Sequence, residues 1–267
     1  MSREQRLVFG EVAELYDRHR PAYPDAVVDD LVALAGLEPG ALVLEVGAGT
    51  GKATSMFAAR QIRVLGVEPS AEMAAVARRV CARYPGVQIE QSDFERWDPA
   101  GRAFPLVFAA QAWHWVDPAV GFAQAARVLR AGGVLAAFWN RPVWAGAELR
   151  AEVLDAYQRT VPEILDESDP MHPANSPPRD GQDWRRGVGA TRGLSAAGVR
   201  DYEWSQTYSA RDYASLLETH STVRVLDQKQ RSALVRAVER AIARHGDELR
   251  LPFLTRLCVA RRTAAGA

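Results

Sequence analysis

Short apolar runs alternate with helical stretches through the first half of the chain. Blocks rich in Val, Leu, Ile and Ala predict buried strands at residues 42–46, 62–67, 87–90, 105–109 and 133–139. Helices are expected between them, at about residues 52–60, 70–83 and 118–129. Strands that alternate with helices form βαβ units around a parallel sheet, so the pattern predicts an α/β fold.

Further elements are expected on both sides of this core. Two helices precede it, at about residues 3–18 and 24–36, separated by a proline corner. After Asn140 the pattern predicts a helix, a loop rich in Asp, Pro and Ser, a strand, two helices and a final strand, at 146–166, 167–183, 199–208, 210–220, 228–245 and 251–261. We therefore expect a helical cap (1–39), a core (40–140), a lid insertion (141–198) and closing strands and helices (199–267). We also expect 167–183 and 3–24 to order over a ligand pocket.

Three glycines follow the first strand at alternate positions, Gly47, Gly49 and Gly51, directly before a predicted helix. Glycine lets the backbone turn tightly and lets a ligand approach the main chain with no Cβ in the way. A dinucleotide-binding loop has the spacing Gly-x-Gly-x-x-Gly, so here the third glycine comes one residue too early. Glu45 also lies inside the strand end, where a carboxylate repels a pyrophosphate and suits a cationic ligand. The loop therefore argues against a nicotinamide-dependent oxidoreductase, which remains the less favoured alternative.

The second predicted strand is followed by Glu68, and an acidic residue at this strand tip binds ribose hydroxyls in such folds. Together, Glu45-x-Gly47-x-Gly49-x-Gly51 and Glu68 resemble the class I S-adenosylmethionine-dependent methyltransferases, whose first motif is an acidic residue followed by Gly-x-Gly-x-Gly. The resemblance covers about residues 40–140, and it is to the small-molecule group that includes trans-aconitate and ubiquinone-pathway methyltransferases.

This resemblance implies a Rossmann-like three-layer sandwich with a seven-stranded, mostly parallel sheet, an N-terminal helical cap and an inserted lid. It implies S-adenosylmethionine as the cofactor and S-adenosylhomocysteine as the product. The implied activity is transfer of a methyl group to an O, N, S or C atom of a small molecule. A protein that binds the same cofactor for cyclisation or regulation would carry the same loop, so this alternative stays open.

The resemblance also assigns cofactor-binding roles to residues in several loops. Asp93 follows the third strand, where the family's acidic residue accepts a hydrogen bond from the adenine amino group, and Phe94 would flank the ring. A solvated loop aspartate is the alternative for Asp93, and helix-end packing is the alternative for the N-terminal residues. The full set expected at the cofactor is Glu45, Gly47, Gly49, Gly51, Glu68, Pro69, Asp93, Phe94, Gln111, Tyr16 and Arg20.

Aromatic and polar side chains are crowded together after the fourth strand, in Gln111-Ala112-Trp113-His114-Trp115. Ligands of open α/β sheets bind at this carboxyl edge. His114 is the candidate general base because an unperturbed imidazole titrates near pH 6.5, and a structural histidine between two tryptophans is the alternative. The residues expected to line the acceptor site are Tyr23, Trp113, Trp115, Trp139, Asn140 and Trp144, with core packing as the alternative for the tryptophans.

Composition excludes several other classes of function. The formal net charge is +0, so no overall field attracts nucleic acid or an anionic membrane, and the Asn/Asp-Pro-Pro-aromatic motif of base methyltransferases does not occur. The five histidines lack metal-ligand spacing, and Cys81 and Cys258 are expected to be small core residues. No apolar run suggests a secretion signal or a membrane span. We expect a cytoplasmic protein, monomeric or homodimeric, whose partner is a small-molecule methyl acceptor.

Overall fold

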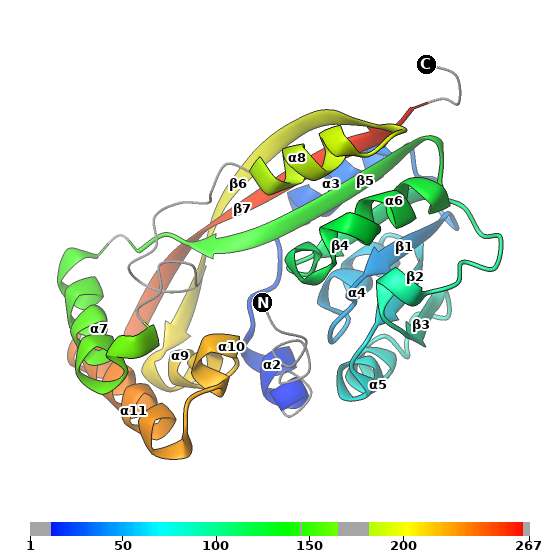
Figure 1. The fold of residues 1–267 in the computed structure, drawn as a ribbon. Coiled ribbons are helices and arrows are strands. Elements are labelled where there is room, and N and C mark those ends of the chain that lie inside the picture. The colour runs from blue at the N-terminus through cyan, green and yellow to red at the C-terminus, as the bar shows by residue number, and fades with distance from the viewer. Residues whose placement is uncertain (1–11, 145, 165–181, 264–267) are drawn as a thin grey trace.

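A computed structural model describes residues 12–144, 146–164 and 182–263 (Figure 1). Seven strands form one sheet in the order β3-β2-β1-β4-β5-β7-β6, in which β7 runs antiparallel to both of its neighbours and the other pairs are parallel. The strands are β1 (Leu42–Val46), β2 (Arg63–Glu68), β3 (Val87–Gln91), β4 (Phe104–Ala110), β5 (Leu129–Pro142), β6 (Leu194–Ser209) and β7 (Glu248–Arg262). This topology confirms the predicted seven-stranded, mostly parallel α/β sheet.

Helices cover both faces of the sheet. One face packs against α3 (Asp25–Leu34) and α4 (Lys52–Ala59), and the other against α6 (Pro118–Val128) and α8 (Gln182–Ala190). A fifth helix, α5 (Ala71–Val80), lies along β2 and β3. Local capping starts two of these helices, because the side chains of Ser70 and Asp117 accept backbone N–H groups in the first turns of α5 and α6.

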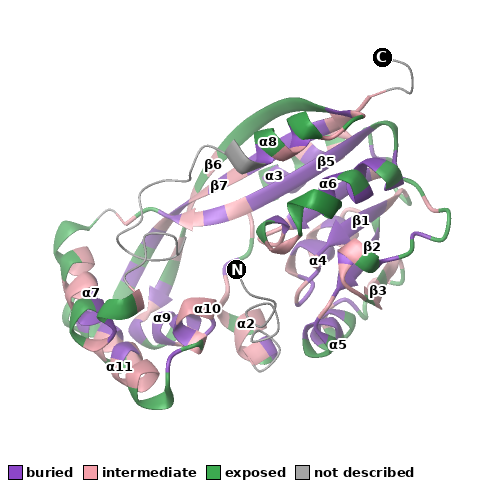
Figure 2. Ribbon diagram, viewed as in Figure 1, coloured by how far each residue is buried: buried purple, intermediate pink, exposed green. Residues whose placement is uncertain are grey.

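The last three strands are much longer than the first four and carry a second group of helices at their far end (Figure 1). This helical extension consists of α7 (Ala147–Thr160), α9 (Ala210–Leu217), α10 (Ser221–Arg224) and α11 (Gln228–Arg244). It has its own buried core, in which residues of α7, α9 and α11 pack against Tyr208 and Phe253 on the sheet (Figure 2). Strands β5, β6 and β7 all extend past the predicted bounds, because pairing with neighbouring strands orders polar segments that no apolar pattern marks.

The segment expected to form a single lid, residues 141–198, is divided between two places. Within it, α7 packs with α9 and α11 in the helical extension, whereas α8 packs on the sheet beside α6. Nearly all of the loop expected at 167–183 lies outside the described residues, as does most of the helix expected at 3–18.

The N-terminal helix α2 (Ala13–His19) joins the sheet core to the helical extension. Towards the core, Arg79 of α5 forms an ion pair with Glu14 (2.6 Å), and Lys52 Nζ donates to the backbone carbonyl of Asp17 (2.5 Å). Towards the extension, α2 contacts α9. Of the expected cap (1–39), the structure describes residues 12–39, which contain this helix and α3.

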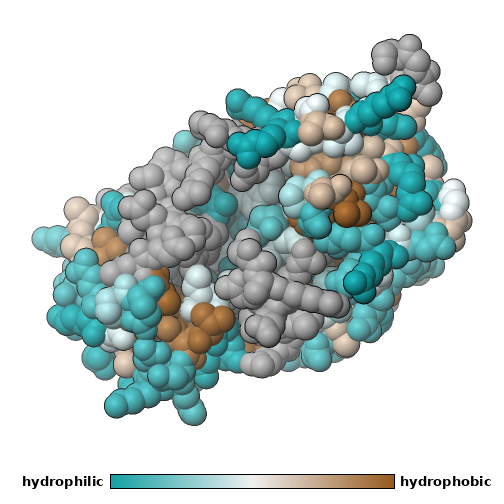
Figure 3. All heavy atoms as spheres, viewed as in Figure 1, coloured by the Kyte–Doolittle hydropathy of each residue, from teal (hydrophilic) through white to brown (hydrophobic). Residues whose placement is uncertain are grey.

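The described surface is mainly hydrophilic on the one face that Figure 3 shows. On the face in Figure 3, hydrophobic residues lie scattered among hydrophilic ones. Within the described ranges, the exposed large hydrophobic residues are Val120, Val143, Val199 and Val225, which come from different parts of the chain. Among the described residues, no helix has the length and apolar character needed to cross a membrane.

Candidate active site

The glycine loop turns the chain from β1 into α4. All three glycines have positive φ, at +69°, +57° and +86°, a region that residues with side chains rarely adopt. A Cβ on Gly47 would lie 2.5 Å from the Ala112 Cβ, and a Cβ on Gly51 would lie 2.9 Å from the Cys81 Sγ. A Cβ on Gly49 would meet nothing within 4 Å. Packing therefore excludes side chains at Gly47 and Gly51, whereas Gly49 presents bare main chain to open space.

Glu68 is fixed beside this open main chain at the end of β2. Its Oε2 accepts a hydrogen bond from the Gly49 N–H (2.8 Å), and its Oε1 accepts one from the Ser70 N–H (2.9 Å). Pro69 lies between Glu68 and Ser70 in the chain. Burial raises the pKa of Glu68 to about 6, and the two hydrogen bonds act in the opposite direction. The carboxylate is therefore mostly ionised at neutral pH. A carboxylate has about four lone-pair sites, and each oxygen retains one for a further donor.

Glu45 lies beneath the glycine loop and is almost fully buried. Its Oε2 accepts the hydroxyl of Thr54 from α4 (2.5 Å). Burial raises the pKa of Glu45 to about 8, the Thr54 bond opposes this rise, and the nearby charge of Glu68 adds to it. At neutral pH the Glu45 carboxyl is therefore mostly protonated, and it would ionise only next to a cationic group.

Thr50, between the second and third glycines, is a polar residue that sequence reasoning missed. It is 1% exposed, and its hydroxyl has no hydrogen-bond partner among the described residues. Thr54 was missed as well. A lone threonine in or after such a loop has no distinctive pattern, and the only signal was a polar residue on the sheet-facing side of a predicted helix.

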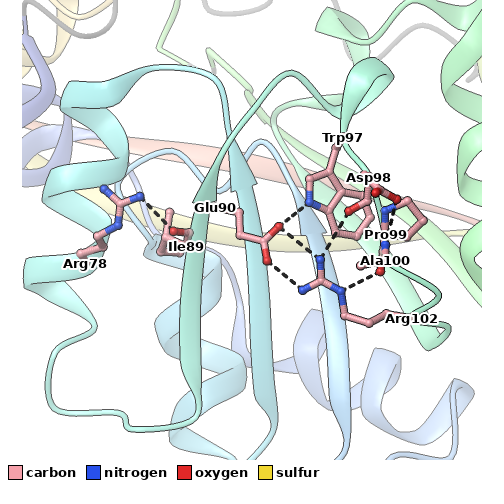
Figure 4. Close-up of polar contacts among 8 residues, drawn as sticks. All are labelled: Arg78, Ile89, Glu90, Trp97, Asp98, Pro99, Ala100 and Arg102. Carbon is pink, nitrogen blue, oxygen red and sulfur yellow. Dashed lines mark hydrogen bonds and ion pairs between the residues drawn. The ribbon is translucent and has the colours of Figure 1, made fainter.

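A polar network fixes the turn that follows β3 (Figure 4). Glu90 accepts hydrogen bonds from Trp97 Nε1 (2.5 Å) and from Arg102 Nη1 (2.7 Å), and the Arg102 guanidinium lies 5.2 Å from the centre of the Trp97 ring. Asp93 lies within this turn, directly before a short 3-10 helix, η2 (Phe94–Arg96). The network holds Asp93 at the carboxyl edge of the sheet.

Asp93 and Phe94 differ in what they offer a ligand. The Ser92 N–H donates to the Glu68 carbonyl (3.1 Å), which places the Asp93 turn next to the end of β2. Phe94 is 3% exposed, and its ring packs on Trp97 and Trp113 at centroid distances of 6.4 and 6.2 Å. The Phe94 side chain thus belongs to the core, and only its backbone remains a candidate for contact with an adenine.

His114 projects from a short 3-10 helix, η3 (Trp113–Trp115), after β4. The indole Nε1 of Trp139 donates to His114 Nδ1 (3.1 Å). The imidazole is exposed, but protein surrounds it on its other sides, and this desolvation, together with the positive charge of Arg141, lowers the pKa of His114. The ring is therefore neutral at pH 7, and because Nδ1 accepts, Nε2 carries the proton.

This tautomer changes the chemistry available to His114. A general base needs an unprotonated nitrogen facing its substrate, and Nε2 bears a hydrogen instead. The arrangement suits donation of a hydrogen bond to an acceptor oxygen better than removal of a proton.

The tryptophans near His114 divide between core and edge. Trp113 is 6% exposed and packs edge-on against Phe122 and Trp184, so it is a core residue. Trp115 is partly buried with its ring 5.0 Å from the His114 ring, and Trp139 is partly buried against Trp184. Trp115 and Trp139 remain candidates for the acceptor site.

Asn140 is 1% exposed, and both polar atoms of its side chain form hydrogen bonds within the protein. Its Nδ2 donates to the Ala22 carbonyl (2.8 Å), and its Oδ1 accepts the Thr255 hydroxyl (2.6 Å), which itself accepts Trp204 Nε1 (2.8 Å). Asn140 therefore ties the cap to β5 and β7, and burial keeps this side chain away from a substrate in the open part of the site.

Gln111 closes the open edge of β5 just beyond the end of β4. It has a positive φ of +56°, its N–H donates to the Phe138 carbonyl (2.9 Å), and its Nε2 donates to the Asn140 carbonyl (3.1 Å). A non-glycine residue in this region is strained and persists only where its surroundings hold it. The strain lies where β4 ends and the candidate site begins.

The N-terminal candidates lie in different places, and of them Tyr23 packs on the face of the sheet that α3 covers. The Tyr23 ring meets Phe138 edge-on at 4.9 Å, and burial raises the pKa of Tyr23, so its hydroxyl stays protonated. The Arg20 guanidinium lies 5.0 Å from the Tyr16 ring centre and donates from Nε to the Thr219 hydroxyl (2.7 Å) and from Nη2 to the Thr219 carbonyl (2.9 Å). Arg20 therefore reaches towards the helical extension.

Trp144 lies at the far end of β5, within the helical extension. Its ring meets Tyr213 of α9 edge-on at 5.7 Å. Asn140 and Trp139, being adjacent on β5, point to opposite faces of the sheet. The structure thus does not bring the expected acceptor residues into one cluster.

Comparison with known proteins agrees with this architecture. Residues 43–133 match a family described as a methyltransferase domain. An uncharacterized methyltransferase of Mycobacterium tuberculosis (strain H37Rv) is 30% identical over 262 residues, which cover 96% of each chain. Trans-aconitate 2-methyltransferase of Azoarcus sp. (strain BH72) is 39% identical over 110 residues, which cover 40% of this chain and 42% of that enzyme.

A solved structure of a proposed type II methyltransferase from Anaeromyxobacter dehalogenans has the same fold. It superposes with a TM-score of 0.61 at 22% identity, over 91% of this chain and 97% of that one. The full-length similarity to the mycobacterial methyltransferase, the matched domain and the strand order agree with the resemblance drawn from the glycine loop. The chain belongs to the class I S-adenosylmethionine-dependent methyltransferase family.

Proposed function

We propose that this protein binds S-adenosylmethionine at the carboxyl edge of β1, β2 and β3 and transfers its methyl group to an anionic small molecule. The observation that carries the proposal is the Glu68 carboxylate, fixed by Gly49 and Ser70 with one lone pair left on each oxygen. Two vicinal ribose hydroxyls would supply the two donors that this arrangement lacks.

Other features beside Glu68 fit the same cofactor. Gly49 offers bare main chain to open space, and the buried hydroxyl of Thr50 has no partner among the described residues. Glu45 is protonated while it is alone, and an ammonium group nearby would favour its ionised form. Asp93 is the candidate for the adenine amino group. These residues would hold a ligand that has an adenine, a ribose and an amino acid end.

The protein's contribution to the reaction is mainly orientation. When bound, the cofactor supplies a methyl group on a positively charged sulfur, which is already activated for displacement. Correct placement of two reactants lowers a barrier by roughly 7–11 kcal/mol. The Nε2–H of His114 would hold an acceptor oxygen at the end of β4, and a neutral histidine with this tautomer needs an acceptor that arrives without a proton to lose.

Transfer of label tests this function. The protein is incubated with S-adenosylmethionine carrying a labelled methyl group and with matched series of small carboxylic acids, alcohols and amines. We expect label in the carboxylic acid series, and much less with a Glu68→Ala variant. Transfer to alcohols alone would contradict the anionic acceptor, and cofactor binding without transfer to any series would favour the non-methylating alternative.

A further inference from the structure

Arg20 is a cation held in a fixed orientation by neutral partners. Thr219 fixes the guanidinium through two hydrogen bonds, and Tyr16 stacks beneath it. A guanidinium has five N–H donors, so three remain. Among the described residues no acidic side chain forms an ion pair or hydrogen bond with Arg20, whereas many other arginines have such a partner.

Tyr208, near the end of β6, places an unused donor close to the same cation. It is 3% exposed, and its hydroxyl has no hydrogen-bond partner within the described part of the chain. Burial raises the pKa of Tyr208, and the positive charge of Arg20 acts in the opposite direction. Both residues pack at α9 and the turn after it, Tyr208 through the ring of Tyr213 and Arg20 through Thr219. The hydroxyl stays protonated, and a buried donor without an acceptor is unfavourable unless a ligand or water completes it.

A second unused donor lies in the same aromatic cluster. Tyr208 and Trp144 each meet the ring of Tyr213 edge-on, at centroid distances of 5.9 and 5.7 Å. The Trp144 Nε1 is buried and also has no partner among the described residues. The cluster thus combines a cation with two neutral donors, and Asp212, the acidic residue next to Tyr213, lies 3.5 Å from His19 Nδ1.

We propose that Arg20 and Tyr208 form an oxyanion subsite between the cap and the helical extension, and that it binds a carboxylate of the methyl acceptor that is not itself methylated. A planar carboxylate matches the free Nη1–Nη2 edge of the guanidinium, with the Tyr208 hydroxyl as a third donor. Trp144 packs on the same Tyr213 ring as Tyr208 and would contact the rest of the same molecule.

The position of Arg20 connects this subsite to the candidate active site. Ala22, two residues after Arg20, accepts a hydrogen bond from Asn140 Nδ2 (2.8 Å), and the neighbouring Trp139 donates to His114 Nδ1 (3.1 Å). A ligand with a charged group at each end could therefore reach from the subsite towards the carboxyl edge of the sheet. This inference rests on the proposed function, and it assigns Arg20 to the acceptor instead of to the cofactor expected from sequence.

Calorimetry with glutarate, a simple dicarboxylate, tests the subsite. The protein is first titrated with S-adenosylhomocysteine, and the loaded protein is then titrated with glutarate at constant ionic strength, with neutral glutaramide as the control ligand. We expect glutarate to bind and glutaramide not to bind. Tyr208→Phe should weaken glutarate binding about tenfold, and Arg20→Gln should abolish it, with S-adenosylhomocysteine affinity unchanged in both.

Tyr202→Phe is the matched control on the same strand. The Tyr202 hydroxyl donates to Asp30 (2.5 Å), so its loss should lower the melting temperature and leave glutarate affinity unchanged. Tyr208→Phe should leave the melting temperature of the unliganded protein unchanged, because its hydroxyl loses no partner. The proposed subsite is contradicted if the loaded wild type fails to bind glutarate. It is also contradicted if Tyr208→Phe lowers stability without weakening glutarate binding. Failure to bind S-adenosylhomocysteine would instead overturn the proposed function.

Discussion

The carboxyl edge of β1 and β2 and the helical extension on β5, β6 and β7 are built by different kinds of contact. At the edge, the key hydrogen bonds join residues that are close in sequence, such as Ser70 to Glu68 and Thr54 to Glu45. In the extension, the key contacts join distant segments, such as Arg20 to Thr219 and Asn140 to Thr255. A site of the first kind leaves a motif in the sequence, and a site of the second kind does not.

The largest effect is expected from Glu68, which tests the edge alone. Glu68→Ala removes two charge-assisted hydrogen bonds to the ribose, each worth roughly 1.5–3 kcal/mol, so S-adenosylhomocysteine affinity should fall at least tenfold. Calorimetry measures the change. Unchanged affinity would show that Glu68 does not bind the ribose.

Two glycines of the loop have different roles, because Gly47 is packed against Ala112 and Gly49 faces open space. Gly49→Ala should lower the free energy of unfolding by about 1–2 kcal/mol, because φ is positive there, and should also weaken cofactor binding. Gly47→Ala should cost about 1–3 kcal/mol more in stability, because its Cβ would overlap that of Ala112. Urea denaturation compares the two variants, and equal stability losses would contradict the packing role of Gly47.

Thr255 tests the junction between the two regions. Thr255→Val leaves Asn140 Oδ1 and Trp204 Nε1 without their shared partner, which should cost about 1–3 kcal/mol of unfolding free energy. Thr207→Val, at an exposed position of β6, is the control and should be nearly neutral. If both variants unfold at the same urea concentration, the hydrogen-bonded junction does not stabilise the fold.

Glu45 gives the unliganded protein a specific pH dependence. Its pKa is raised in the folded protein to about 8 from an ordinary value near 4.5, so between these pH values the unfolded chain loses a proton that the folded chain keeps. The contribution of Glu45 to stability therefore falls as pH rises through this range, with a slope of up to about 1.4 kcal/mol per pH unit. The difference in unfolding free energy between wild type and Glu45→Gln at pH 5 and pH 8 isolates this slope. A difference that does not change with pH would mean that Glu45 is ionised in the folded protein.

The smallest effect is expected from His114. Its two possible roles, hydrogen-bond donor and general base, predict different pH dependence of the rate and different recovery of the rate in His114→Gln. As a hydrogen-bond donor, His114→Ala should lower kcat/KM about tenfold, His114→Gln should restore much of the rate, and the rate should show no rise near pH 6.5. A general base would instead give a loss of about 10²–10⁴-fold with no rescue by Gln. The measurement uses whichever acid accepts label.

Sequence reasoning located the edge well, because Glu45, the three glycines and Glu68 lie on predictable strand ends. It misjudged side-chain direction at Phe94, Trp113 and Asn140, which the structure places in the core or in hydrogen bonds within the protein. Their orientation depends on partners such as Thr255, which lie far away along the chain. The divided 141–198 segment was missed for the same reason, since the partners of α7 lie on α9 and α11.

The most direct test of the central claim is calorimetric titration of the wild-type protein with S-adenosylhomocysteine and, in parallel, with NADH. The arrangement of Gly49, Thr50 and Glu68 predicts one S-adenosylhomocysteine bound per chain and no measurable heat with NADH. Tight binding of NADH, or no binding of S-adenosylhomocysteine, would contradict the account.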